Sequence, residues 1–283
     1  MKIAVLSDIH GNYPALEKVV NHIETWKPDL VFVAGDIVNR GPRSSDCFFV
    51  INEKQGEDNW IVIRGNHEDY VINRSEAGHP TSGSLFNLHQ PIFYVYEQLN
   101  EDISLLKNLP DTYHFSAPDH GEVRMRHASM RNNRDGIYPE TGDNELRKQI
   151  APAPEVFITG HTHRPLVRRI NGTLIVNAGS VGLPFDRDFR TGYAQITHNS
   201  TGWTGEIIRL EYDRAQAEKD FYDTGYLEGA GPIASIVLLE FKSALSQLYH
   251  WSERFSRDVL DGKISVLDST ERFLDDPVSK PYW

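Results

Sequence analysis

The chain contains an apolar run, Leu30-Val31-Phe32-Val33-Ala34, which leads directly into Gly35-Asp36-Ile37-Val38-Asn39-Arg40-Gly41. The apolar run predicts a buried strand, and Gly35 allows the backbone to turn sharply where that strand ends. Asp36 is therefore expected just past the carboxyl end of a strand, at the edge of an open α/β sheet where ligands bind. Arg40 follows closely enough to reach the same space. A single aspartate in this position could equally cap the next helix, so the interpretation depends on the other strand ends.

The first half of the chain has the pattern of a βαβ unit. Lys2–Leu6 predicts a first strand, and apolar residues at helical spacing between residues 16 and 26 predict a helix before the strand at Leu30–Ala34. Parallel strands joined by a helix begin a parallel sheet, whereas the second half of the chain is rich in strands. This order fits two sheets that face each other with helices outside both. Further strands are expected at Trp60–Ile63, Tyr113–Phe115, Glu122–His127, Val156–Thr159, Val167–Ile170, Thr173–Asn177, Tyr193–Thr197 and Thr204–Leu210.

The expected domain boundary falls near residue 212. Residues 1–212 would form the catalytic domain, with a helical insert at about residues 68–108 beside the strand ends. Residues 213–283 would form a mainly helical C-terminal extension, in which apolar residues step by three and four and predict one helix with a single apolar stripe. That stripe could dock onto the catalytic domain or pair with a second copy in a homodimer. It comprises Val237, Phe241, Ala244, Leu248, Trp251 and Phe255.

The composition is that of a globular protein with an acidic balance. The 283 residues include 40 acidic and 29 basic side chains, a formal net charge of −11, which argues against an extended nucleic-acid-binding surface. Cys47 is the single cysteine, so neither an internal disulfide nor a thiolate metal cluster is expected. The first residues enter a strand without a signal-peptide pattern, and the apolar run Ile233–Leu239 is too short to span a bilayer. We therefore expect a cytoplasmic protein that does not associate with membranes.

Eight residues with metal-binding or proton-transfer chemistry follow predicted strands. Carboxylate and amide oxygens with imidazole nitrogens are the ligands of Mn²⁺, Fe, Zn²⁺ or Ni²⁺ rather than of a Ca²⁺ site. Any one of these histidines alone would more often be a buried structural residue. Pairs two residues apart in extended chain, however, place both side chains on one face, where they converge. Without His67, the other seven residues are too many ligands for one tetrahedral site, and they fit two ions that share a carboxylate. The eight residues are Asp8, His10, Asp36, Asn66, His67, His127, His161 and His163.

Several other side chains could act beside this site. His67 directly follows Asn66, so it can stand beside the metals without binding them and donate a proton to a leaving oxygen. Asn12 could orient a ligand or the nucleophile, or simply form an Asx turn after Gly11. Four arginines in later loops are expected to face solvent, with substrate contact as the alternative. They are Arg131, Arg134, Arg187 and Arg190.

Five motifs in this order resemble the signatures of the calcineurin-like metallophosphoesterase superfamily, over about residues 1–210. They are Asp8-Ile9-His10, Gly35-Asp36, Gly65-Asn66-His67-Glu68, His127 and Gly160-His161-Thr162-His163. The resemblance implies an α/β fold, a four-layer α/β/β/α sandwich of two facing mixed sheets with helices outside, plus the C-terminal helical extension. It also implies two divalent transition-metal ions, with Mn²⁺ expected first and Fe, Zn²⁺ or Ni²⁺ as alternatives. One ion would be held by Asp8, His10, Asp36 and His163, and the other by Asp36, Asn66, His127 and His161, so that Asp36 is shared.

The same resemblance assigns roles to residues around the ions. His67 matches the catalytic histidine of the family. Arg40 matches an arginine that binds the substrate phosphate in the phosphoprotein-phosphatase branch. By contrast, Gly160–His163 and Asn177–Gly182 are more similar to small bacterial and archaeal phosphodiesterases, so features of two branches are mixed in this chain.

These features together predict a dinuclear metal-dependent phosphoesterase. It would hydrolyse phosphate mono- or diesters by in-line attack of a hydroxide that bridges the ions. Arg40 and Asn66 would bind the phosphate oxygens, and His67 would protonate or stabilise the departing alkoxide. A small phosphorylated substrate or a phosphoprotein is the expected partner. The alternative is a non-catalytic binding or scaffold protein on the same fold, and the acidic balance argues against a nuclease.

Overall fold

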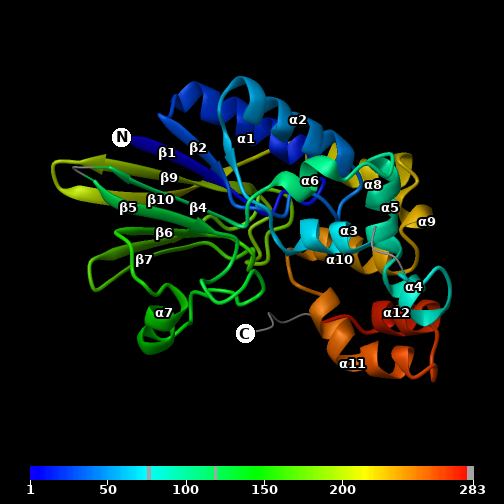
Figure 1. The fold of residues 1–283 in the computed structure, drawn as a ribbon. Coiled ribbons are helices and arrows are strands. Elements are labelled where there is room, and N and C mark those ends of the chain that lie inside the picture. Colours follow the sequence, from blue (N-terminus) through cyan, green and yellow to red (C-terminus); the bar gives the residue numbers. More distant parts are fainter. Residues whose placement is uncertain (75–77, 118–119, 279–283) are drawn as a thin grey trace.

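Two five-stranded sheets form the centre of the protein (Figure 1), in a computed structural model that describes residues 1–74, 78–117 and 120–278. In the first sheet the strand order is β10-β9-β1-β2-β3. Strands β1, β2 and β3 run parallel, while β9 pairs antiparallel with both β1 and β10. The strands of this sheet span Lys2–Leu6 (β1), Leu30–Val33 (β2), Ile61–Val62 (β3), Thr191–Asn199 (β9) and Gly202–Leu210 (β10).

The second sheet has the order β4-β5-β6-β8-β7. Its three inner strands run parallel, and each edge strand pairs antiparallel, so both sheets are mixed. A tight turn at Asn171-Gly172 joins β7 to β8, and both of its residues have positive φ. The strands span Thr112–Ala117 (β4), Gly121–Arg126 (β5), Val156–Thr159 (β6), Leu166–Ile170 (β7) and Thr173–Asn177 (β8).

Side chains alternate along β1 between two apolar cores. Ile3 and Val5 point into the core between the sheets, whereas Ala4 and Leu6 join the core that helices α1 and α2 cover. On the far side of the second sheet, α7 packs over β6 and β8. The predicted sandwich of two facing mixed sheets with helices outside is therefore confirmed. The helices of these outer layers span Tyr13–Trp26 (α1), Ser44–Glu57 (α2) and Asp143–Gln149 (α7).

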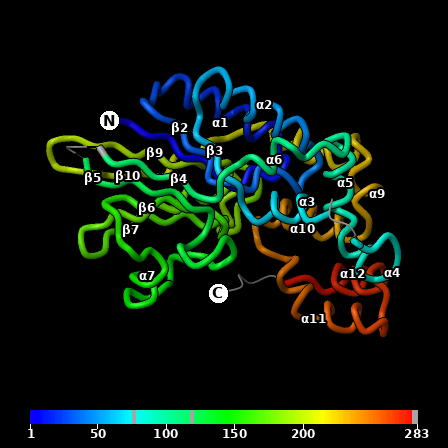
Figure 2. Tube along the Cα trace, viewed as in Figure 1, coloured from blue at the N-terminus to red at the C-terminus, as the bar shows by residue number. Residues whose placement is uncertain are grey.

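The predicted insert and the C-terminal extension lie together at one end of the sheets, in both the ribbon and the tube (Figures 1 and 2). Helix α4 of the insert contacts α11 and α12, and α5 contacts α10. Residues 75–77 of the predicted insert lie outside the described residues. The insert contains α3 (Asn66–Arg74), α4 (Gly83–Leu88), α5 (Gln90–Gln98) and α6 (Ser104–Asn108). The extension contains α8 (Arg214–Asp223), α9 (Tyr226–Gly229), α10 (Ile233–Ser243), α11 (Leu248–Leu260) and α12 (Val266–Asp275).

The prediction of one continuous helix in the extension is wrong, because the chain breaks between α10 and α11. Ala244 has a left-handed backbone with φ of 51°, which ends α10. The carboxylate of Glu240 then accepts hydrogen bonds from the backbone N–H groups of Gln247 and Leu248, both at 2.9 Å, so it satisfies the free donors where α11 begins. The apolar spacing continues across the break although the helix does not.

The stripe residues of α10 pack against other parts of the same chain. Val237 and Phe241 pack with Leu183 and Phe185, so this part of the stripe docks onto residues of the predicted catalytic domain. A homodimer through the extension remains an untested prediction. Across the described ranges, no helix combines the length and the apolar character that are needed to cross a membrane.

Candidate metal centre and active site

The potential ligands lie on short loops at the ends of the strands or directly after them. Five of these residues have a left-handed backbone, with φ between 48° and 68°. Such a backbone costs roughly 1 kcal/mol or more for a residue other than glycine, so it persists only where the surroundings hold it. The loops therefore have a strained shape that aims their side chains into one space. The five residues are Asp8 and His10 after β1, Asp36 after β2, and His161 and His163 after β6.

Asp8, His10 and His163 form the first group of potential ligands. The Nε2 atoms of His10 and His163 are 3.1 Å apart, and Asp8 Oδ1 is 3.3 Å from His163 Nε2. Asp36 reaches this group, since its Oδ2 atom is 3.7 Å from His10 Nε2. All the ligand atoms of Asp8, His10 and His163 lie within 4.8 Å of one another.

A second group approaches the same Oδ2 atom of Asp36. His127 Nε2 is 3.2 Å from Asp36 Oδ2 and 3.1 Å from Asn66 Oδ1. The ligand atoms of Asp36, His127 and His161 also lie within 4.8 Å of one another. Asp36 is thus the carboxylate that the two groups have in common, and all seven predicted ligands are brought together.

Backbone carbonyl groups fix the direction of each imidazole. A ring nitrogen that is bonded to a carbonyl leaves the opposite nitrogen free to face the centre, and this contact also selects the tautomer. Three histidines thereby present Nε2 and one presents Nδ1. The bonds run from His10 Nδ1 to Asn39 O (3.2 Å), His127 Nδ1 to Ala34 O (2.7 Å), His163 Nδ1 to Leu183 O (2.5 Å) and His161 Nε2 to Arg134 O (3.1 Å).

Two buried atoms at the centre lack a hydrogen-bond partner among the described residues. They are Asp8 Oδ1 and His161 Nδ1. The other carboxylate oxygen of Asp8 is already bonded to the Ser7 hydroxyl (2.6 Å) and to the backbone N–H of His161 (2.8 Å). An unsatisfied buried acceptor is costly, and a cation would satisfy both atoms. The oxygen and nitrogen donor set therefore fits divalent transition-metal ions.

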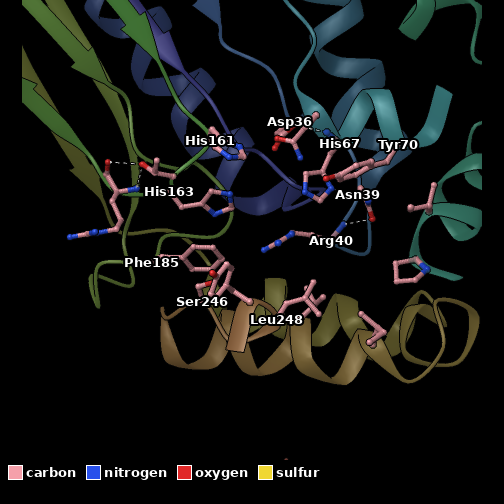
Figure 3. A pocket seen from close by; sticks show the side chains of 18 of the residues that line it. Asp36, Asn39, Arg40, His67, Tyr70, His161, His163, Phe185, Ser246 and Leu248 are labelled. Carbon is pink, nitrogen blue, oxygen red and sulfur yellow. Dashed lines mark hydrogen bonds between the residues drawn. The ribbon is translucent and has the colours of Figure 1, made fainter. Parts of the chain in front are cut away.

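His67 stands beside the shared carboxylate (Figure 3). Its Nδ1 accepts a hydrogen bond from the side-chain amide of Asn39 at 2.9 Å, which leaves Nε2–H directed away from that contact. Burial lowers the pKa of His67 to about 3 against the opposing charge of Asp36, and the positive charge of Arg40 adds to the lowering, so the ring is neutral at pH 7. His67 also lies close enough to His10 and Asp36 for the three side chains to hold one metal ion. Both a catalytic and a ligating role are therefore within its reach.

Arg40 lies at the mouth of the same site and is held from the C-terminal extension. Its Nη1 is 3.0 Å from Glu240 Oε2, and Glu240 is fully buried on α10. The guanidinium also faces the ring of Phe185 at 5.8 Å, and that ring stacks on His163 with centroids 4.3 Å apart. Sequence reasoning missed Glu240 and Phe185, because neither lies in a motif and Glu240 is 200 positions from its partner.

The chain is similar to known proteins. A family model described as the calcineurin-like phosphoesterase superfamily domain matches residues 1–200. The chain belongs to this superfamily. The predicted resemblance is confirmed, and with it a phosphoesterase family and a cluster of residues able to bind divalent metal ions.

Known proteins match this chain over different lengths. Uncharacterized protein MJ0912 of Methanocaldococcus jannaschii is 26% identical over 235 residues, which cover 76% of this chain and 89% of that protein. Serine/threonine-protein phosphatase 2 of Escherichia coli is 33% identical over 78 residues, only 27% of this chain and 34% of that protein. The metallophosphoesterase structure from Sphaerobacter thermophilus has a TM-score of 0.66 at 24% identity and covers 87% of this chain and 99% of its own. At that identity it supports the fold.

The remaining polar candidates have partners among their neighbours, and Arg134 has one, Tyr70, that lies beside His67. Asn12 caps α1, since its Oδ1 accepts the N–H of Ala15 and its amide donates to Gly182 O. Arg131 is bonded to Asp135 and Glu145 at 2.6 Å each, and Arg190 to Asp188 at 2.7 Å. Arg134 places its guanidinium 4.9 Å from the Tyr70 ring. Arg187 lines a separate surface hollow together with Arg190.

Glu68 holds the loop that carries the shared carboxylate, a role that sequence reasoning missed although the residue lies within a quoted motif. Its side chain is fully buried and accepts four backbone hydrogen bonds. Burial and the charge of Asp36 raise the pKa of Glu68 to about 7, and the backbone hydrogen bonds oppose that shift. The donors are the N–H groups of Asp36 (2.8 Å), Ile37 (2.7 Å), Val38 (3.1 Å) and Gly65 (2.7 Å).

The Glu68→Gln substitution is expected to destabilise the fold by about 2–5 kcal/mol, because a side-chain amide places its own N–H₂ against backbone donors. Chemical denaturation of the metal-free protein measures the change. Glu57→Gln, at an exposed position of α2, is the matched control and should leave stability unchanged. Equal midpoints for both variants would show that the Glu68 contacts do not hold the loop.

The metal-free centre holds a proton on His127. Burial alone would lower the pKa of this ring, but the Asp36 carboxylate at 3.2 Å, with Asp8 nearby, raises it to about 10. Burial likewise opposes ionisation of Asp36, yet His127 outweighs it and holds the pKa of that carboxyl well below its usual range. A metal ion that binds His127 must therefore displace this proton.

Metal affinity is consequently expected to rise with pH. Below a pKa of about 10, each unit of added pH increases the neutral fraction of His127 about tenfold, so the apparent Kd should fall about a hundredfold between pH 6 and pH 8. Titration calorimetry in buffers of different ionisation enthalpy measures the proton released. The His127→Ala variant should lose this slope. A pH-independent Kd in the native protein would contradict the assignment.

Proposed function

We propose that this protein is a hydrolase of phosphate mono- or diesters that works with two divalent transition-metal ions, Mn²⁺ first among them. The observation that carries the proposal is the position of Asp36, whose Oδ2 atom is 3.7 Å from His10 Nε2 in one group of potential ligands and 3.2 Å from His127 Nε2 in the other. Asp8, His10 and His163 would complete one site, and Asn66, His127 and His161 the other. When bound, the ions supply Lewis acidity, which lowers the pKa of water and neutralises phosphate charge.

The residues around the centre have complementary roles in the proposed reaction. Water displaces the ester oxygen at phosphorus in line, and the bond from phosphorus to the departing alkoxide breaks. Arg40 and Asn66 bind phosphate oxygens, for which the guanidinium is suited by its fixed planar array of donors. His67 is neutral with its proton on Nε2, so it donates a hydrogen bond that stabilises the departing oxygen, and the proton that this oxygen finally takes up comes from the attacking water.

Hydrolysis of p-nitrophenyl phosphate and bis(p-nitrophenyl) phosphate, measured side by side, tests this function. The protein is stripped with a chelator and assayed with Mn²⁺, Zn²⁺, Ni²⁺ or no metal added back. We expect turnover that depends on added metal, and the ratio of the two rates gives the preference for monoester or diester. Two ions bound per chain without turnover of either ester would favour the non-catalytic scaffold instead.

A further inference from the structure

A cavity of about 350 Å³ opens directly onto the candidate metal centre. One wall carries the chemistry and includes Asp36, His67 and His161. Leu248 and Ser246 face that wall from the side of the C-terminal extension (Figure 3). The volume is near the lower end of the range for small-molecule sites, which is about 300–1,000 Å³. The cavity therefore suits a compact ligand rather than a segment of a folded protein.

The wall opposite the metal centre is apolar and comes from two distant parts of the sequence. The insert contributes residues of α4 and α5, and the extension contributes residues of α10 and α11. These helices contact one another, so the wall is continuous from the insert to the extension. Its members, here called the apolar wall, are Leu88, Pro91, Ile92, Ile233, Val237 and Leu248.

Aromatic rings flank the space between the two walls. Phe185 is held in place, because it stacks on His163 with an angle of 8° between the rings. Tyr70 and Tyr138 also line the cavity, with Tyr70 against the His67 ring at 5.1 Å between centroids. Rings held in this way present flat apolar surface to a ligand without a large loss of side-chain entropy.

The cationic side chains of the cavity are already engaged by carboxylates. Arg40 is paired with the buried Glu240 at 3.0 Å, and Arg164 is paired with Glu140. Among the described residues that line the cavity, these two arginines are the permanent cations. The positive charge of two metal ions and one partly neutralised arginine balances the negative charge of a single phosphoryl group. A chain of several phosphates would bring more negative charge than this lining balances.

We infer that the substrate is a small ester with one phosphoryl group and a compact apolar or aromatic ester group, selected by the apolar wall. The inference rests on the proposed function and narrows it. It places the phosphoryl group at the metal centre beside Arg40 and the ester group against α5, α10 and α11. Phosphoproteins and polyphosphates are thereby poor substrates.

Two alkyl monoesters test this inference. Both release an alkyl alcohol, so a difference in rate reports on the pocket and not on the class of leaving group. The metal-loaded full chain is assayed with 2-phenylethyl phosphate and with glycerol 3-phosphate, and also with a phosphoserine peptide and inorganic diphosphate. We expect kcat/KM for the phenylethyl ester to exceed that for the glycerol ester by about tenfold or more, since even single apolar groups in a pocket discriminate by about 10–200-fold. The peptide and diphosphate should be turned over more slowly still.

Variants of the apolar wall locate the origin of the preference. Leu248→Ala should reduce the ratio of kcat/KM between the phenylethyl and glycerol esters by about tenfold. Ile92→Ala, from the opposite segment of the wall, should reduce the same ratio even if Leu248→Ala perturbs folding. Leu260→Ala removes the same atoms from an exposed position of α11 and should leave kcat/KM unchanged for both substrates.

The outcomes separate this inference from the proposed function. Turnover of glycerol 3-phosphate, diphosphate or the phosphopeptide as fast as that of the phenylethyl ester would overturn the inference and leave the phosphoesterase intact. An unchanged ratio in both wall variants would do the same. Failure to hydrolyse any ester with any metal, p-nitrophenyl phosphate included, would overturn the proposed function itself.

Discussion

Replacing Asp36 by alanine is expected to abolish metal-dependent hydrolysis and to release bound metal from both sites. Its Oδ2 atom is 3.7 Å from His10 Nε2 and 3.2 Å from His127 Nε2, so one oxygen reaches both groups of potential ligands. Residues that only support a metal ligand account for about 10–100-fold in affinity, so loss of a ligand shared by two ions should exceed a hundredfold. Metal analysis after gel filtration, together with kcat, measures both effects.

Asp36→Asn distinguishes the charge of this residue from its packing. Asp36 Oδ1 accepts the backbone N–H of His67 at 2.8 Å, and an asparagine keeps that acceptor. We therefore expect Asp36→Asn to keep this backbone contact and to fold with a lowered thermal midpoint, because His127 loses its counter-charge, while it still loses the metals. Full metal content in Asp36→Asn would rule out the shared-carboxylate arrangement.

The His67→Ala substitution is expected to lower kcat by about 10²–10³-fold, the usual contribution of a positioned hydrogen-bond donor to a developing negative charge. If His67 acts on the leaving oxygen, the variant retains its metals. The loss should also be larger for 2-phenylethyl phosphate than for p-nitrophenyl phosphate, because a nitrophenolate leaves without help. Because burial lowers the pKa of His67 to about 3, its ionisation should add no inflection to the native rate profile between pH 5 and pH 9.

Two results of this experiment would change the role of His67. Its distance from His10 and Asp36 also permits metal ligation, so loss of a metal ion from His67→Ala would make it a ligand. An equal loss of rate for both esters would remove its role at the leaving oxygen. Asn39→Ala, which removes the partner of His67 Nδ1, should reproduce part of the loss without removing metal.

The sequence allowed prediction of features that depend on local pattern. Apolar runs predicted the buried strands, and Asp8, Asp36 and His161 were placed at strand ends because polar residues directly follow those runs. The carboxyl ends of parallel strands meet at one edge of a sheet, so strand-end position was enough to predict that these residues converge. The two facing sheets followed from the order of the elements.

Features that depend on long-range contacts could not be predicted in this way. The apolar spacing of the extension continues through Ala244, so periodicity alone indicated one helix, whereas the break depends on a left-handed residue and on the Glu240 carboxylate. The apolar wall brings Ile92 and Leu248 to one cavity, although each alone has the pattern of an ordinary helix residue. Glu68 was visible in its motif, but its role depends on four N–H groups that converge only in the fold.

The contact between Glu240 and Arg40 couples the evolution of two segments that lie far apart in the sequence. A chimaera that took its extension from a relative without this carboxylate would leave the largely buried Arg40 guanidinium without its counter-charge, which costs about 3–5 kcal/mol. The same exchange would remove the acceptor that begins α11. The loop after β2 and the extension are therefore expected to change together among descendants of this chain. New substrate preferences would then arise by replacement of Arg40, Glu240 and the apolar wall as one unit.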